Sequence, residues 1–153
     1  MKSSAEVGLE KIAQETIEEA RVVLPGIQAL FGFQLIAVFN ERFQQLSAFE
    51  QLIHFTALLL IASAIGLIMT PAAYHRIAER STVSKFFITL SSWLIAGAMV
   101  PLMLAICLEV YLLGRLVLGE TGPSILVSGV LLTGLAAMWF VFPVLMRRHR
   151  FQG

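Results

Sequence analysis

The chain has 153 residues, of which 58% are hydrophobic and only 14% are charged. Soluble domains average roughly 45–50% apolar and about 25% charged residues, so this composition excludes an ordinary soluble fold. The net charge is +1, and no basic patch is interleaved with aromatic residues, which excludes nucleic acid as a partner.

Residues 3–20 have the pattern of an amphipathic helix. Ser3 and Glu6 have capping-box spacing, in which each side chain bonds a free backbone N–H at the start of a helix. Small and apolar residues recur at helical intervals on one side, while Glu and Gln line the rest. A basic face would suit anionic lipid better than this acidic one. Two interpretations therefore stay open: an interfacial lead-in helix, or a docking helix for a partner or a second copy.

Four long apolar stretches follow, at residues 22–39, 52–73, 86–113 and 125–146. A helix needs about 20 residues to cross a bilayer. The sequence therefore predicts an all-α fold: an integral membrane bundle of four transmembrane helices. A cytoplasmic lead-in helix at residues 1–21 precedes this 22–146 domain, and a basic tail follows at residues 147–153. Pro25 would then lie in the first turn of its span, where its missing N–H costs nothing.

The Lys and Arg residues alternate between the two sides of these spans. The five segments outside the spans hold three, one, three, one and three of them. Short cytoplasmic loops of membrane proteins collect Lys and Arg, and this bias sets the orientation. We therefore expect both termini in the cytoplasm.

Small residues recur at four-residue spacing in three of the spans. In lipid, helices associate through close packing at such residues and through interhelical hydrogen bonds. The stripes favour a compact bundle; they are Ala62, Gly66 and Thr70, then Ser92 and Ala96, then Gly129, Thr133 and Ala137.

Two ionisable side chains fall inside the spans, His54 near the outer end of the second and Glu109 in the outer third of the third. An ionisable residue within a span is a functional hypothesis by default. Gln34 lies at a similar depth in the first span, and Ser128 in the fourth. If these residues face inward, they form an outer polar cluster that could carry protons or bind a small cation. If they face outward, His54 and Glu109 are near enough to the interface to extend into it.

The sequence predicts no cofactor and no metal site. Haem would need two axial His ligands within reach of one iron, but His54 and His75 are about 31 Å apart along one helix and His149 is in the tail. Cys107 is the single cysteine, and no His or Cys neighbours it. No paired carboxylates and no Ser/His/Asp set share one site, so we expect a protein without enzymatic activity.

The cytoplasmic mouth of the bundle is a second candidate site. Glu19 and Arg21 lead into the first span, and His75 and Arg76 leave the second. Consecutive helices usually pack side by side, so Glu19 could pair with Arg76, or Arg21 with Glu79. Ion pairing at the helix ends is one interpretation, and a site for lipid phosphate or a soluble partner is the other.

The first half of the chain resembles an uncharacterised bacterial family, domain of unknown function 6328. The resemblance rests on the run 19–33 (EARVVLPGIQALFGF), on Phe39, Arg42, Phe43, Leu46 and Phe49, and on the run 71–76 (PAAYHR). It implies a four-span bacterial membrane protein and brings no activity or cofactor. It favours Arg21, Gln28, His75 and Arg76 as site residues, because these are the polar positions of the motif.

Together these observations predict a multi-pass protein of the bacterial plasma membrane. We expect a non-enzymatic accessory or self-associating module, with membrane lipids and either a second copy or a larger membrane complex as partners. The alternative is a small transporter or channel that uses the outer cluster of Gln34, His54 and Glu109.

Overall fold

All regular structure in the described residues, 4–78 and 84–150 of a computed structural model, is helical. The helices are α1 (Ser4–Ala37), α2 (Ala48–Ala78), α3 (Lys85–Leu118), α4 (Thr121–Ala136) and α5 (Phe142–Arg150). A short 3₁₀ helix, η1 (Glu41–Gln45), follows α1, and a π-helical segment, η2 (Ala137–Val141), joins α4 to α5. Within these residues, four helical rods are long and apolar enough to cross a membrane. The predicted all-α fold with four membrane-length helices is confirmed.

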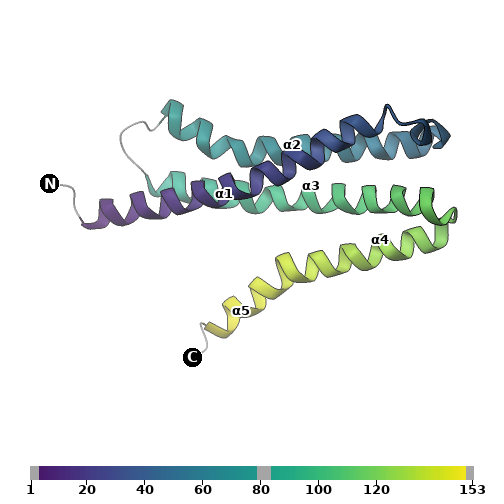
Figure 1. Ribbon diagram of the computed structural model, residues 1–153. Coiled ribbons are helices and arrows are strands. Elements are labelled where there is room, and N and C mark those ends of the chain that lie inside the picture. Colours follow the sequence, from purple (N-terminus) through teal and green to yellow (C-terminus); the bar gives the residue numbers. More distant parts are fainter. Residues whose placement is uncertain (1–3, 79–83, 151–153) are drawn as a thin grey trace.

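The connection between α1 and α2 and the connection between α3 and α4 lie at the same end of the molecule. Figure 1 shows the α1–α2 and α3–α4 connections together at this end, which we call the hairpin end. The start of α1, the end of α2, the start of α3 and the end of α5 lie toward the opposite end, which we call the terminal end. Residues predicted to be in the outer half of each span therefore gather at the hairpin end.

Local capping explains where α3 begins and where it ends. Ser84 precedes α3, and its Oγ accepts a hydrogen bond from the Phe87 N–H at 3.0 Å. Gly119 ends α3 with a φ of 71°, a left-handed conformation that glycine adopts without strain. The chain can therefore reverse directly into α4.

The lead-in segment and the first span form one unbroken helix. At 1.5 Å per residue, the 34 residues of α1 are roughly 50 Å long, well beyond a hydrocarbon core of about 30 Å. Pro25 lies inside this helix. The prediction that its missing N–H costs nothing was wrong, because the Arg21 carbonyl loses its helical partner there.

The core lies mainly between α2 and α3, which make the most extensive contact of any two helices, and α1 packs against both. The buried cluster consists of Ile27, Ala57, Ile61, Ala64, Ile68, Ala98 and Ala105. Alanine and isoleucine thus share the α2 face that meets α3. Small residues let the backbones approach, and isoleucines fill the remaining space.

The small-residue stripes do not form these interfaces, so that prediction was wrong. All eight of their residues are exposed. Thr70 Oγ1 donates to the Gly66 carbonyl at 2.8 Å, and Thr133 Oγ1 donates to the Gly129 carbonyl at 2.8 Å. Because the hydroxyls bond within their own helix, they need no partner on a neighbouring one.

The fourth rod consists of α4, η2 and α5. It packs against α3 near the hairpin end and then diverges from the other helices (Figure 1). Gly114 allows the close approach, since a Cβ built there would lie 3.0 Å from Ser124 Oγ. One interhelical hydrogen bond adds to it, from Ser128 Oγ to the Cys107 carbonyl at 2.7 Å. Further along, Pro143 cannot donate to the Trp139 carbonyl and its ring crowds that oxygen, which accounts for the π turn just before it.

Candidate functional site

His54 joins three helices at the hairpin end. Its side chain projects from α2 into the bundle, where the residue is only 4% exposed. Its Nδ1 lies 2.9 Å from Oε1 of Glu109 on α3. Its Nε2 lies 3.1 Å from the backbone carbonyl oxygen of Gln34 on α1. One imidazole therefore bridges α1, α2 and α3, and it faces the interior rather than the membrane interface.

The two contacts of His54 constrain where the His54–Glu109 pair can hold protons. A carbonyl oxygen only accepts, so Nε2 must carry a proton. The contact between Nδ1 and Glu109 Oε1 is an ion pair by distance only when His54 is protonated, because Oε1 has no aligned hydrogen-bond donor among the described residues. A second proton on the pair favours this contact, since it removes the repulsion between a bare Nδ1 and a carboxylate.

Gln34 places an unpaired amide in the same region. The residue is 4% exposed, and neither Oε1 nor Nε2 of its side chain has a hydrogen-bond partner within the described part of the chain. Buried polar atoms are normally paired, because leaving one unpaired costs about 1–3 kcal/mol. The Gln34 amide thus leaves two buried polar atoms unpaired at the hairpin end.

A pocket of about 280 Å³ opens beside the pair. His54 and Glu109 line it, and Glu109 supplies its only carboxylate. The other walls are mostly leucine, valine and the ring of Phe43, whose edge meets the His54 ring at 5.1 Å between centroids. Asn40 and Arg42 line its exposed side. The pocket is thus largely apolar, with one titratable pair on its inner wall.

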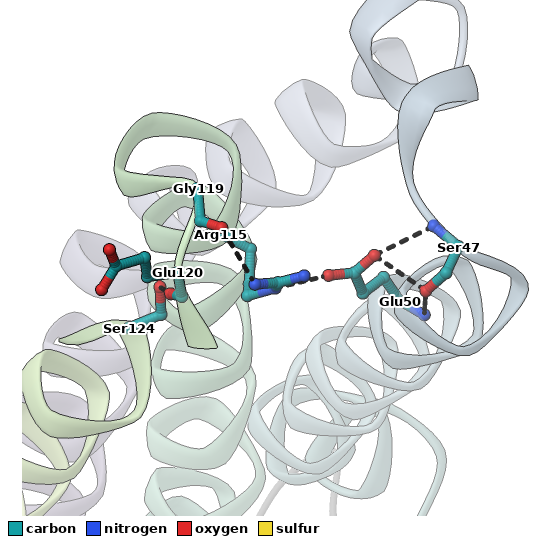
Figure 2. Close-up of polar contacts among 6 residues, drawn as sticks. All are labelled: Ser47, Glu50, Arg115, Gly119, Glu120 and Ser124. Carbon is teal, nitrogen blue, oxygen red and sulfur yellow. Dashed lines mark hydrogen bonds and ion pairs between the residues drawn. The ribbon is translucent and has the colours of Figure 1, made fainter. Parts of the chain in front are cut away.

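A second polar constellation holds α2 and α3 together at the hairpin end (Figure 2). The Ser47 N–H and Oγ donate to Glu50 Oε2 at 2.9 and 2.8 Å, and the Glu50 N–H donates to Ser47 Oγ at 3.3 Å. The other carboxylate oxygen of Glu50 accepts from Arg115 Nε at 2.7 Å, and Arg115 Nη1 reaches the Gly119 carbonyl at 3.4 Å. We call Ser47, Glu50 and Arg115 the hairpin clamp.

The hairpin clamp lies next to the His54–Glu109 pair. Glu50 precedes His54 by about one turn of α2, and Arg115 follows Glu109 by less than two turns of α3. The clamp therefore fixes the register of the two helices that carry the pair. The sequence carries a signal for part of the clamp that was not among the predictions: the Ser47-x-x-Glu50 spacing before an apolar run is the signature of a capping box.

The residues predicted at the cytoplasmic mouth lie toward the terminal end. Arg21, Gln28 and Arg76 are exposed. Arg21 lines an apolar pocket of about 180 Å³ between α1, α2 and α3, and the His75 ring packs against Phe87 at 5.4 Å between centroids. The pairing of Arg21 with Glu79 lies outside the described residues, as does the side chain of Glu19.

The structure thus brings Gln34, His54 and Glu109 together, whereas Ser128 bonds to α3 instead and does not contact them. Among the described residues, no three His, Cys, Asp or Glu side chains gather closely enough to hold a metal ion. The hairpin end therefore offers a proton-holding pair, an unpaired amide and an adjoining pocket.

Comparison with known proteins adds a family. Residues 4–143 match a family of unknown function, DUF6328. No curated protein and no solved structure matches the chain.

Proposed function

The chain belongs to the DUF6328 family, whose function is unknown, and we propose that it is a small transporter or channel that moves protons or a small cation through its hairpin end. The observation that carries the proposal is the inward-facing His54–Glu109 pair. Ionisable residues within spans are expensive to bury, and where they face the bundle interior they mark ion and proton pathways. The pocket beside the pair gives such an ion a place to bind.

The same groups do not suggest catalysis. His54 is engaged on both ring nitrogens, by Glu109 and by the Gln34 carbonyl, and no nucleophile within the described residues lies in hydrogen-bond contact with it. A catalytic assignment would need a nucleophile, a base and an orienting group in mutual contact. We therefore assign binding and passage to the site, and no bond-making step.

Ion movement can be measured in proteoliposomes that enclose a pH-sensitive dye. Internal pH is followed after a proton gradient is imposed, and separately after an inward gradient of tetramethylammonium. We expect the internal pH to change faster than in protein-free liposomes under at least one gradient. Glu109→Gln should return the rate to the protein-free value, because it removes the titratable carboxylate.

A matched control is Glu120→Gln, which makes the same chemical change at the hairpin end. The Glu120 side chain is exposed and makes no capping hydrogen bond, so this variant should keep the wild-type rate. Wild-type rates equal to those of protein-free liposomes under both gradients would contradict the proposed function.

A self-associating membrane module is the second candidate, and the fourth rod supports it. The most apolar stretch of this rod buries none of its residues in the single chain. Its exposed face carries Gly129, Thr133 and Ala137 at four-residue spacing, which lets a second helix approach closely. We propose a second copy of this chain as the occupant of that face.

Native mass spectrometry in mild detergent tests this second candidate. We expect a dimer from the wild type and monomer from Gly129→Leu, because the added side chain blocks close approach. Val127→Leu enlarges an exposed side chain on the same rod and should leave the dimer intact. A wild-type protein recovered only as a monomer would count against self-association.

We also propose the bacterial plasma membrane as the location, with both termini cytoplasmic. The family resemblance supports a bacterial source, and the alternating Lys and Arg residues support the orientation. In this orientation the hairpin end, with its pocket, faces outward.

A further inference from the structure

We propose that the His54–Glu109 pair exchanges one proton for one monovalent organic cation, which binds in the pocket beside it. This inference rests on the proposed function and names the species that the hairpin-end site handles. Two observations support it: the contacts of the two His54 ring nitrogens with Glu109 and Gln34, and the residues that line the pocket.

The proton is held at one identifiable position. Nε2 keeps its proton and donates it in a hydrogen bond to the Gln34 carbonyl, because that oxygen can only accept. The exchangeable proton is the second proton of the pair, held on Nδ1 or on Glu109 Oε1, which are 2.9 Å apart. When it leaves, the bond from Nδ1 or Oε1 to hydrogen breaks, its electron pair stays behind, and the proton passes to water at the mouth of the pocket.

Loss of that proton leaves an uncompensated negative charge at the inner wall of the pocket. Glu109 becomes a carboxylate beside a neutral imidazole whose Nδ1 lone pair faces it. A buried carboxylate without a counter-charge is strongly unfavourable. A cation in the pocket compensates it and keeps the charge of the site unchanged, with no covalent bond formed. The proton and the cation therefore compete to neutralise the same negative charge, that of the Glu109 carboxylate.

The lining selects the chemical class of the cation. Leu112, Leu116 and the Phe43 ring supply apolar and aromatic surface, which suits an organic cation more than a hydrated inorganic ion. The volume of about 280 Å³ has room for an aromatic ammonium compound of modest size.

Other charged groups near the pair favour a single positive charge. Glu50 on α2 is already neutralised by Arg115 on α3. Tyr111 lies two residues beyond Glu109 on α3. Arg42 in the α1–α2 connection lines the exposed side of the pocket and forms no ion pair within the described residues. Its positive charge repels a divalent ion about twice as strongly as a monovalent one.

Proton counting by calorimetry tests the exchange directly. The full-length protein in lipid nanodiscs is titrated with benzyltrimethylammonium, in two buffers that differ in ionisation enthalpy. This quaternary cation carries no ionisable proton, so every proton released comes from the protein. We expect binding with release of about one proton per cation, and affinity that falls about tenfold for each unit by which pH is lowered where the pair is protonated.

Variants and a matched anion separate the possible outcomes. Glu109→Gln should lose cation binding, and Glu120→Gln should keep both the affinity and the proton count. Benzenesulfonate, a permanent anion of similar size, should not bind. Cation binding without proton release would overturn the exchange but leave the proposed function in place. Absence of cation binding, or binding of benzenesulfonate instead, would overturn the exchange; if proteoliposome fluxes are also absent, the proposed function fails as well.

Discussion

Glu50 shows how one side chain can serve a helix end and a helix pair at once. One carboxylate oxygen closes the capping box with Ser47, and the other binds Arg115 across the α2–α3 interface. The residue is 8% exposed, so these bonds are largely sheltered from water. Charge-assisted hydrogen bonds of this kind are about twice as strong as neutral ones. The hairpin end is therefore held by side-chain bonds as well as by apolar packing.

Replacing Glu50 should destabilise the protein measurably. Glu50→Ala removes the carboxylate that accepts from the Ser47 N–H and Oγ, and it also leaves the half-buried Arg115 without its partner. We expect the free energy of unfolding in an SDS titration to fall by about 1–3 kcal/mol in total. Glu41→Ala removes an exposed carboxylate in η1 and should change it little. Equal losses in the two variants would show that the clamp contributes nothing beyond an ordinary surface charge.

At the scale of single residues, the depth of a polar residue within its span was the sequence feature that best predicted the site. His54, Glu109 and Gln34 were predicted as a possible cluster because they occupy similar depths on three helices, and the structure brings them together. Sequence could not show which way each side chain faces, since that depends on helix rotation set by packing. Nor could it show that Gln34 contributes its backbone carbonyl to His54 while its amide stays unpaired.

At the scale of the helix, hydropathy predicted that each membrane-length helix exists and roughly how long it is. It did not predict which face of each helix packs against its neighbours. The small-residue stripes lie on the outer faces of α2, α3 and α4, while α2 packs on α3 through Ala57, Ile61 and Ala64. In a membrane helix nearly every face is apolar, so hydrophobic periodicity does not distinguish the lipid side from the protein side. The predicted lead-in helix and the first span are one continuous helix, α1, so Pro25 lies in its interior rather than in its first turn.

The contact between α3 and α4 makes a prediction at this scale. A Cβ at Gly114 would lie 3.0 to 3.2 Å from Oγ, Cβ and Cα of Ser124, and the Cα belongs to the backbone and cannot rotate away. Gly114→Ala should therefore push α4 from α3 and lower the free energy of unfolding by about 1–3 kcal/mol.

Gly134→Ala on α4 is the matched control for Gly114→Ala, because nothing lies within 4 Å of a Cβ at that position. It should leave stability unchanged or raise it by about 0.5–1 kcal/mol, since alanine favours helix more than glycine does. Both variants can be compared in the same SDS titration. If Gly114→Ala proves as harmless as Gly134→Ala, the close approach of α3 and α4 is not a stabilising contact.

At the scale of the whole molecule, most of the described basic residues and the polar site lie toward opposite ends. Arg21, Arg76, Lys85 and Arg147 are positioned toward the terminal end, whereas the His54–Glu109 pair and the hairpin clamp lie at the hairpin end. Basic residues near span ends hold an orientation in the membrane during insertion. The same charge pattern that sets the topology would thus decide which compartment reaches the pocket first.

The orientation can be measured with single cysteines, since Cys107 is buried and the chain has no other cysteine. Gln44→Cys places a thiol on the exposed η1 at the hairpin end, and Arg148→Cys places one near the end of α5. In intact bacterial cells, a membrane-impermeant maleimide should label the Gln44→Cys variant and leave the Arg148→Cys variant unlabelled. After the cells are opened, both should react, which controls for accessibility. The reverse pattern would place the pocket on the cytoplasmic side, and any cation exchanged there would be drawn from the cytoplasm rather than from outside.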